Sequence, residues 1–158
     1  MDLPPQANKT ARELVSAKPH GVIAVGPDDT VLQALKVMAE KDIGAVLVMR
    51  GETMVGILSE RDCARKVDLK GRAAANTQVR EIMTEQVVVA RPANTVMQCM
   101  ALMKQRRIRH LPVVDGTKVI GVLSARDVLE EIIAEEEVVL KDLQQERIFY
   151  AGDTGGSY

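Results

Sequence analysis

The sequence predicts an α+β protein in which two tandem β-α-β-β-α units are flanked by an N-terminal and a C-terminal helix. Two observations lead to this fold class. The chain has 158 residues, of which 46% are hydrophobic but only 2% aromatic, so its core must be built from aliphatic side chains. The second half also repeats the first at a constant offset, since Asp127 lies 65 positions after Asp62 and Gly121 lies 65 positions after Gly56.

The repeat aligns residues 20–62 with residues 85–127 without a gap. It ends on its most similar stretch, where Gly56–Asp62 and Gly121–Asp127 both read Gly-x-x-Ser-x-Arg-Asp. A period of 65 residues is longer than the roughly 20–50 residues of solenoid repeats. The repeat therefore indicates two supersecondary units that pack as a pair.

Each unit contains the same five elements in the same order. Short apolar runs predict buried strands, apolar residues spaced three or four apart after a capping residue predict helices, and glycine in a short turn predicts a hairpin. In the first copy we expect a strand at 22–25, a helix capped by Asp29 or Thr30, strands at 45–49 and 54–58, and a helix from Ser59 to about residue 67. In the second copy we expect a strand at 87–90, a helix capped by Asn94 or Thr95, strands at 111–114 and 119–123, and a helix from Ser124 to about residue 133.

The regions outside the repeat complete the predicted organisation. We expect an N-terminal helical arm at 1–16, the first unit at 17–68, a linker at 69–79, the second unit at 80–134, a charged C-terminal helix at 135–150 and a tail at 151–158. The tail is short and rich in glycine, which is typical of a flexible chain end.

Composition argues against a nucleic-acid partner. The aromatic residues are Phe149, Tyr150 and Tyr158, so residues 1–148 offer no ring on which a base could stack. The net charge of −1 also provides no basic surface for duplex phosphates.

The compartment is predicted from segments that the sequence lacks. Residues 1–10 do not have the basic start and apolar run of a secretory signal. No window approaches 18 uninterrupted apolar residues, so we expect no membrane span and a cytoplasmic location. Cys63 and Cys99 lack the spacing of a metal or redox motif, and we interpret them as small buried side chains in a reducing compartment.

The repeated Ser-x-Arg-Asp sequence has two interpretations. As a capping box, Ser would accept a hydrogen bond from the backbone three residues on, and the Asp side chain would return one. As part of a nucleotide site, Arg61 and Arg126 would bind phosphate oxygens, while Asp62 and Asp127 would accept hydrogen bonds from two ribose hydroxyls. The two interpretations are compatible, because the nucleotide site uses the same local geometry.

These motifs resemble those of a tandem cystathionine-β-synthase (CBS) domain pair. The resemblance covers about residues 12–135 and is carried by the two Gly-x-x-Ser-x-Arg-Asp motifs, by Arg109–Val114 and by Arg80–Thr84. It implies two units related by a pseudo-two-fold axis, two clefts between them, and assembly of pairs into a flat homodimer. It also implies an adenosine-containing ligand in the clefts: AMP, ADP, ATP, NAD or S-adenosylmethionine.

The resemblance further assigns residues to each cleft, because in this family the first strand of one unit lines the pocket completed by the Asp of the other. The cleft of Asp127 would contain Lys18, Val22, Ile23, Ile43, Gly44, Arg109, His110, Pro112, Val122, Leu123, Ser124, Arg126 and Asp127. The cleft of Asp62 would contain Met83, Val87, Val88, Ile108, Ile57, Ser59, Arg61 and Asp62. Core packing is the alternative for the aliphatic residues, and for Val87 or Ile108 taken singly it is the better one.

Charge then predicts a difference between the clefts. Arg109 and His110 stand where the first unit has Gly44 and Ala45, so we expect the Asp127 cleft to be the better site for an anionic ligand.

The function predicted from these features is sensing rather than catalysis. The sequence shows no Ser-His-Asp or Cys-His set, no Walker loop and no metal-ligand cluster, so we expect neither an enzyme nor a catalytic cofactor. The leading hypothesis is a regulatory module that binds an adenine nucleotide and signals to an unidentified regulated protein. The alternative is a structural dimerisation module with vestigial clefts and no ligand.

Overall fold

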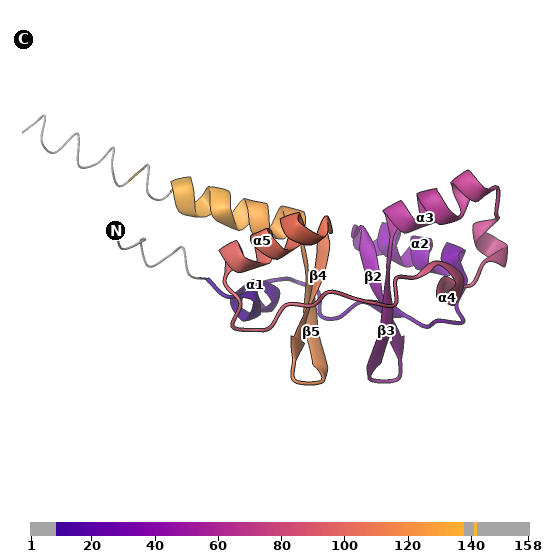
Figure 1. Ribbon diagram of the computed structural model, residues 1–158, viewed down its shortest axis with the longest axis horizontal. Helices are drawn as coiled ribbons and strands as arrows, with labels where there is room; N and C mark the ends of the chain where they lie inside the picture. Colours follow the sequence, from indigo (N-terminus) through magenta and orange to yellow (C-terminus); the bar gives the residue numbers. More distant parts are fainter. Residues whose placement is uncertain (1–8, 138–140, 142–158) are drawn as a thin grey trace, which may run out of the picture.

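Two copies of the predicted unit lie side by side in the computed structural model, which describes residues 9–137 and 141 (Figure 1). The first unit contains β1 (Ala24–Val25), α2 (Val31–Lys41), β2 (Ala45–Arg50), β3 (Thr53–Ser59) and α3 (Glu60–Lys66). The second contains α5 (Val96–Arg106), β4 (His110–Asp115), β5 (Lys118–Ser124) and a helix over 125–137. The remaining elements are α1 (Ala11–Ser16), η2 (Asp68–Lys70), η3 (Ala74–Asn76) and α4 (Val79–Ile82). The α+β class and the tandem arrangement are confirmed.

The first long helix of each unit begins at the same kind of cap. Thr30 Oγ1 accepts a hydrogen bond from the Gln33 N–H at 3.1 Å, and Gln33 Oε1 accepts one from the Thr30 N–H at 2.7 Å. Thr95 and Gln98 form the same reciprocal pair at the start of α5, at 3.2 and 3.0 Å. Thr is therefore the cap in both copies, and these pairs satisfy backbone donors that helix geometry leaves unpaired.

The two sheets differ in one strand. In the first unit β1 runs parallel to β2, which pairs antiparallel with β3, whereas the second sheet contains only β4 and β5. The strand predicted at 87–90 is therefore wrong, since only Ala90 forms an isolated bridge, to Val113.

A proline accounts for the missing strand. In the first unit the Leu47 N–H donates to the Ile23 carbonyl at 3.2 Å. The residue 65 positions after Leu47 is Pro112, which has no N–H to donate to Val88. The Ala90 N–H still donates to the Pro112 carbonyl at 2.8 Å, so the segment follows β4 without forming a ladder.

Each unit completes its core with a helix from outside its own repeat. Ala11 and Val15 of α1 belong to the core of the second unit, where they pack among buried residues that include Leu111 and Leu123. Val79 and Ile82 of α4 belong to the core of the first unit. The N-terminal arm therefore packs on the second unit, and the end of the linker packs on the first. These two segments hold the units side by side.

Two predicted segments extend past the described residues. The helix over 125–137 is continuous across the expected boundary at 134/135. Most of the predicted C-terminal helix and all of the 151–158 tail, including Phe149 and Tyr150, lie outside the described residues. Within the described part, no helix has both the length and the apolarity needed to cross a membrane.

The glycine that opens each repeated motif lies where an outside segment packs on the sheet. A Cβ at Gly121 would lie 2.8 Å from Val15 Cβ of α1. A Cβ at Gly56 would lie 2.8 Å from Met83 Sδ and 2.9 Å from the Thr84 carbonyl oxygen. The backbone of this segment is paired with β3, because the Ile57 N–H donates to the Thr84 carbonyl at 3.0 Å and the Thr84 N–H donates to the Ile57 carbonyl at 2.9 Å. Only glycine leaves room for this approach.

We therefore expect Gly56→Ala to lower the free energy of unfolding by about 1–3 kcal/mol, since the methyl group would overlap a backbone oxygen that cannot move freely. Urea denaturation measures the effect. Gly21→Ala is the control, because its Cβ would meet no atom within 4 Å, and it should change stability by less than about 0.5 kcal/mol. Equal effects of the two substitutions would contradict the close-packing explanation.

Candidate functional site: two pockets between the units

Two pockets lie between the units and take residues from both. The Asp62 pocket has a volume of about 840 Å³ and the Asp127 pocket one of about 550 Å³. Both volumes fall within the roughly 300–1,000 Å³ of pockets that hold small ligands. Gly44, His110, Ser124 and Arg126 line both pockets, so the two share a wall.

The repeat builds both pockets on one plan. In each, the Ser-x-Arg-Asp turn of one unit faces the residues that follow the first long helix of the other unit. The Asp62 pocket combines Ser59, Arg61 and Asp62 with Arg107, Ile108 and Arg109. The Asp127 pocket combines Ser124, Arg126 and Asp127 with Asp42, Ile43 and Gly44.

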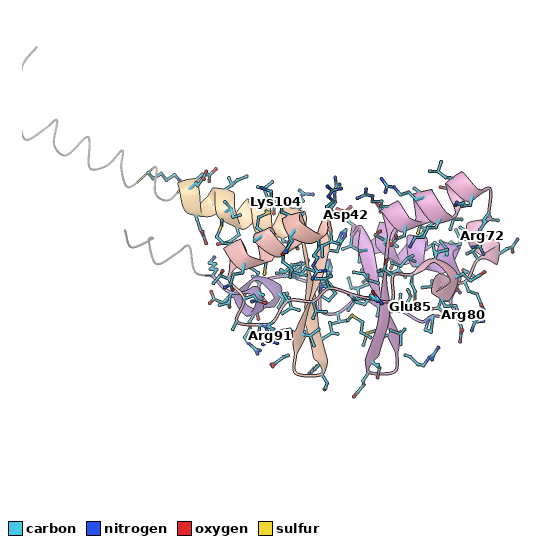
Figure 2. The ribbon with its side chains drawn as sticks, viewed as in Figure 1. Asp42, Arg72, Arg80, Glu85, Arg91 and Lys104 are labelled. Carbon is cyan, nitrogen blue, oxygen red and sulfur yellow. The ribbon has the colours of Figure 1, made fainter. Side chains whose placement is uncertain are left out.

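Backbone geometry directs these helix ends toward the pockets. Helices α2 and α5 terminate at Asp42 and Arg107, whose φ angles of 53° and 55° lie in the left-handed region. Glycine usually ends a helix in this conformation, and a residue with a side chain adopts it at some cost in energy. Figure 2 labels Asp42 at the side of the first unit that faces the second.

Both Ser-x-Arg-Asp turns are capping boxes. Asp62 Oδ2 accepts from the Ser59 N–H at 3.1 Å, and Ser59 Oγ accepts from the Asp62 N–H at 3.1 Å. In the second turn, Asp127 Oδ2 accepts from the Ser124 N–H at 2.8 Å, and Ser124 Oγ accepts from the Asp127 N–H at 3.1 Å. The structural interpretation of the motif is confirmed, and the same bonds hold both carboxylates at the pocket walls.

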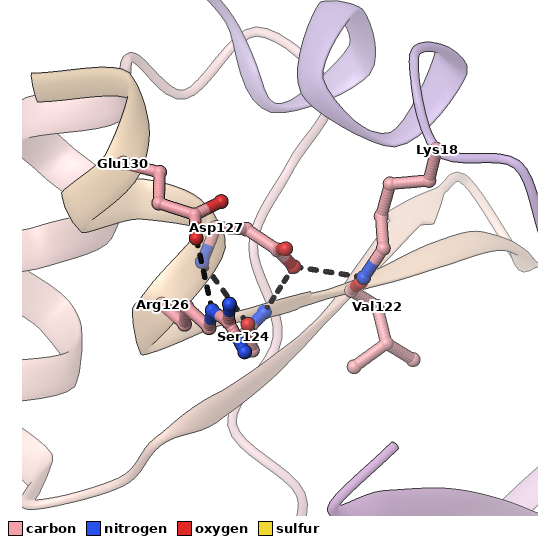
Figure 3. Close-up of polar contacts among 6 residues, drawn as sticks. All are labelled: Lys18, Val122, Ser124, Arg126, Asp127 and Glu130. Atoms are coloured by element: carbon pink, nitrogen blue, oxygen red, sulfur yellow. Dashed lines mark hydrogen bonds and ion pairs between the residues drawn. The ribbon is translucent and has the colours of Figure 1, made fainter. Parts of the chain in front are cut away.

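Asp127 forms an ion pair with Lys18 (Figure 3). Lys18 Nζ donates to Asp127 Oδ2 at 2.7 Å and to the Val122 carbonyl at 2.8 Å. Burial alone would raise the pKa of Asp127, but hydrogen bonds from Lys18 and from the Ser124 N–H outweigh burial and lower this pKa below its usual value. At the equivalent position, 65 residues later, the second unit has Met83, so Asp62 has no such partner. Asp62 instead pairs with Lys66 of its own helix at 3.2 Å.

Charge distinguishes the pockets. The Asp62 pocket is lined by Arg61, Arg107, Arg109 and Arg126, against the carboxylates of Glu60 and Asp62. The Asp127 pocket is lined by Lys18, Lys41 and Arg126, against the carboxylates of Asp42, Asp127 and Glu130. Burial, followed by the positive charge of Lys18, lowers the pKa of His110, so the imidazole in the shared wall is neutral at pH 7. The Asp62 pocket is therefore lined by four positive and two negative side chains, whereas the Asp127 pocket is lined by three of each.

This distribution corrects the predicted position of Arg109. We expected Arg109 in the Asp127 cleft, but it lines the Asp62 pocket. The reason is topological, because Arg109 follows α5 and that end of the second unit faces the Ser-x-Arg-Asp turn of the first. The positive charge that we expected to favour anions near Asp127 therefore gathers near Asp62.

Most other predicted residues line the pocket to which we assigned them. They are Lys18, Ile23, Ile43, Gly44, His110, Val122, Ser124, Arg126 and Asp127 in one pocket, and Ile57, Ser59, Arg61, Asp62, Val87, Val88 and Ile108 in the other. Four predicted residues line neither. Pro112 is buried in β4, Leu123 belongs to the core of the second unit, Val22 is 41% exposed, and Met83 packs against Gly56 and the first core.

Sequence reasoning missed the helix ends. Neither Arg107 nor Asp42 nor Glu130 was assigned to a cleft from the sequence, although all three line the pockets. The repeat does align Asp42 with Arg107, but alignment alone does not show which unit each residue faces.

Both cysteines lie away from solvent, and the described residues form no metal-ligand cluster. Cys63 and Cys99 are both buried, and burial together with the neighbouring Asp62 charge raises the pKa of Cys63 to about 11, so its thiol is protonated at pH 7. Among residues 9–137 and 141, no group of three or more His, Cys, Asp and Glu side chains is placed to hold a metal ion.

We expect Lys18→Met to lower the free energy of unfolding by about 1 kcal/mol at pH 7, because a half-buried carboxylate loses its counterion. Asp127 has a lowered pKa in the folded protein, so its contribution is present above the unfolded pKa of about 3.9 and is lost as pH falls through the folded value. The gap between variant and parent should therefore narrow below about pH 4. Urea denaturation across pH measures this. Lys41→Met, in the same pocket and without an ion pair to a described residue, should show no such gap.

Comparisons with known proteins agree with this architecture. The CBS domain model matches residues 12–68 and 79–134. A structure of a putative signal-transduction protein with CBS domains from Burkholderia ambifaria is 45% identical, with a TM-score of 0.76 over 79% of this chain and 94% of that one. The CBS domain-containing protein YhcV of Bacillus subtilis is 31% identical over 67% of this chain and 75% of its own length.

A plant relative is longer. The mitochondrial CBS domain-containing protein CBSX3 of Arabidopsis thaliana is 38% identical over 73% of this chain, which spans 59% of the plant protein. The repeat, the two interlocked units and these matches together lead to one conclusion: the chain belongs to the CBS domain family and contains a tandem CBS pair.

Proposed function

We propose that this CBS pair is a regulatory module that binds an adenine nucleotide between its units and signals its occupancy to a regulated protein. CBS pairs are generally regulatory modules with adenosine-containing ligands. The observation that carries the proposal here is the Asp62 pocket, in which three arginines, Arg61, Arg107 and Arg109, face a carboxylate that a capping box holds in place.

The polar groups of this pocket match the parts of a nucleotide. Guanidinium groups bind phosphate oxygens through short, charge-assisted hydrogen bonds. Asp62 cannot bind phosphate, but its carboxylate can accept hydrogen bonds from two neighbouring ribose hydroxyls. The arginines and the carboxylate of this pocket therefore provide partners for both the phosphate and the ribose of a nucleotide.

The base would be held without aromatic rings. Ile57, Val87 and Ile108 provide apolar walls. Beside them, neither the N–H nor the C=O of Val88 hydrogen bonds to a described residue, and Pro112 accounts for the free C=O because it has no N–H to donate. A free backbone donor and acceptor in the same residue complement the ring nitrogen and exocyclic amine of adenine.

A ligand in either pocket contacts both units, and this supports signalling. Such a ligand can shift the arrangement of the units only if it binds one arrangement more tightly than another. The proposal includes a homodimer, in which the partner subunit would cover Leu129 and Ile133 of the helix over 125–137, now 51% and 46% exposed. The ligand classes proposed are those with an adenosine group: AMP, ADP, ATP, NAD and S-adenosylmethionine.

Calorimetry with an amide variant tests the site. We expect Asp62→Asn to weaken AMP by about 1.5–3 kcal/mol, the value of hydrogen bonds to a charged group, and to leave 2′,3′-dideoxy-AMP almost unaffected. Glu60→Gln is the matched control, because Glu60 lines the same pocket but takes no part in the capping box, and it should leave AMP affinity within about threefold.

Two results would contradict the proposal. Equal losses for AMP and its dideoxy analogue would show that Asp62 is only a helix cap. Absence of binding below millimolar concentration for all five ligand classes would leave the structural dimerisation module as the better function.

A further inference from the structure

The charge difference between the two pockets arises mainly at two pairs of equivalent positions. Arg107 corresponds to Asp42, and Arg109 corresponds to Gly44, at the ends of α5 and α2. These helix ends contribute two positive charges to the Asp62 pocket and one negative charge to the Asp127 pocket. Two similar backbones therefore present opposite charge to the two pockets.

Ion pairing increases this difference. Lys18 is paired with Asp127 at 2.7 Å, and Arg126 is paired with Glu130 at 2.9 Å, so two of the three cations in the Asp127 pocket already have a carboxylate partner (Figure 3). In the Asp62 pocket, by contrast, no carboxylate of residues 9–137 or 141 lies within 4.0 Å of the guanidinium groups of Arg61, Arg107 and Arg109. These arginines are available to an anion without breaking an existing pair.

The Asp127 pocket also presents carboxylates to any ligand. Asp42 and Glu130 line it together with Asp127, and His110 in its wall is neutral at pH 7. A chain of phosphates there would face carboxylates and would compete with Asp127 for Lys18. A substituent without negative charge would neither be repelled by these carboxylates nor compete with Asp127 for Lys18.

We propose that the two pockets select adenosine compounds by charge. The Asp62 pocket takes an adenine nucleotide, with an affinity that rises with the number of its phosphate groups, and the Asp127 pocket takes an adenosine compound whose 5′ substituent carries no net negative charge. Arg107 and Asp42 are the residues that set this selection. The inference rests on the proposed function and adds to it a ligand class for each pocket.

A charge exchange tests the selection without changing the composition of the chain. Arg107→Asp and Asp42→Arg each place a residue type where the other copy already holds it at nearly the same φ, so both variants should fold. Calorimetry uses ADP and adenosine as probes, without divalent cations, for the parent chain, each single variant and the double variant.

We expect the parent to bind ADP in one pocket at least about tenfold more tightly than adenosine, and this preference to weaken as salt rises. Arg107→Asp should lower ADP affinity by about 100-fold and leave adenosine within about threefold. Asp42→Arg should create a second ADP site, and the double variant should move ADP to the Asp127 pocket, where Asp127→Asn then weakens it.

Arg106→Asp is the matched control. It makes the same change of charge one residue earlier on α5, but Arg106 is exposed and lines neither pocket, so ADP affinity should stay within about threefold.

The inference and the function on which it rests fail differently. The charge selection is overturned if Arg107→Asp weakens ADP and adenosine equally, if Arg106→Asp matches Arg107→Asp, or if the parent binds both probes equally well. The proposed function itself fails if neither probe binds the parent chain.

Discussion

The exchange of short helices between the two units is the constraint on which the rest of the structure depends. Helix α1 completes the core of the second unit, and α4 completes that of the first. Gly56 and Gly121 allow these outside segments to approach the sheets to within a distance that no side chain would permit. Because neither unit can close its core alone, the units face each other across a shared wall, and the pockets follow from that arrangement.

Near-symmetry gives the pockets a common plan, and single residues make them different. The same turn faces the same helix end in both, yet one helix end has Arg107 where the other has Asp42. Lys18 extends the difference, because it occupies the carboxylate of Asp127 while its counterpart Met83 packs into a core. A duplicated unit can thus keep one backbone and acquire two electrostatic environments, since surface charges change at little cost to packing.

Pro112 affects the Asp62 pocket because it has no backbone N–H. Pro112 is buried in β4 and lines neither pocket. Its missing N–H nevertheless ends the parallel ladder and leaves the Val88 carbonyl without a partner at the wall of the Asp62 pocket. In the proposed nucleotide site, whose walls contain no aromatic ring, this free carbonyl would accept a hydrogen bond from the edge of a base.

The sequence by itself determined the elements and the motif, because both depend on neighbouring residues. Apolar periodicity, capping residues at 29–30 and 94–95, and the repeated Ser-x-Arg-Asp turns are local signals, and the structure contains all of them, with Thr as the cap in both copies. Only the tertiary structure decided that Arg109 serves the Asp62 pocket, that Lys18 pairs with Asp127, and that residues 87–90 form no strand. The first two outcomes depend on which surfaces of the two units meet, and the third depends on the pairing of residues 87–90 with Pro112 inside the second unit. In all three, residues far apart in the chain set the contact.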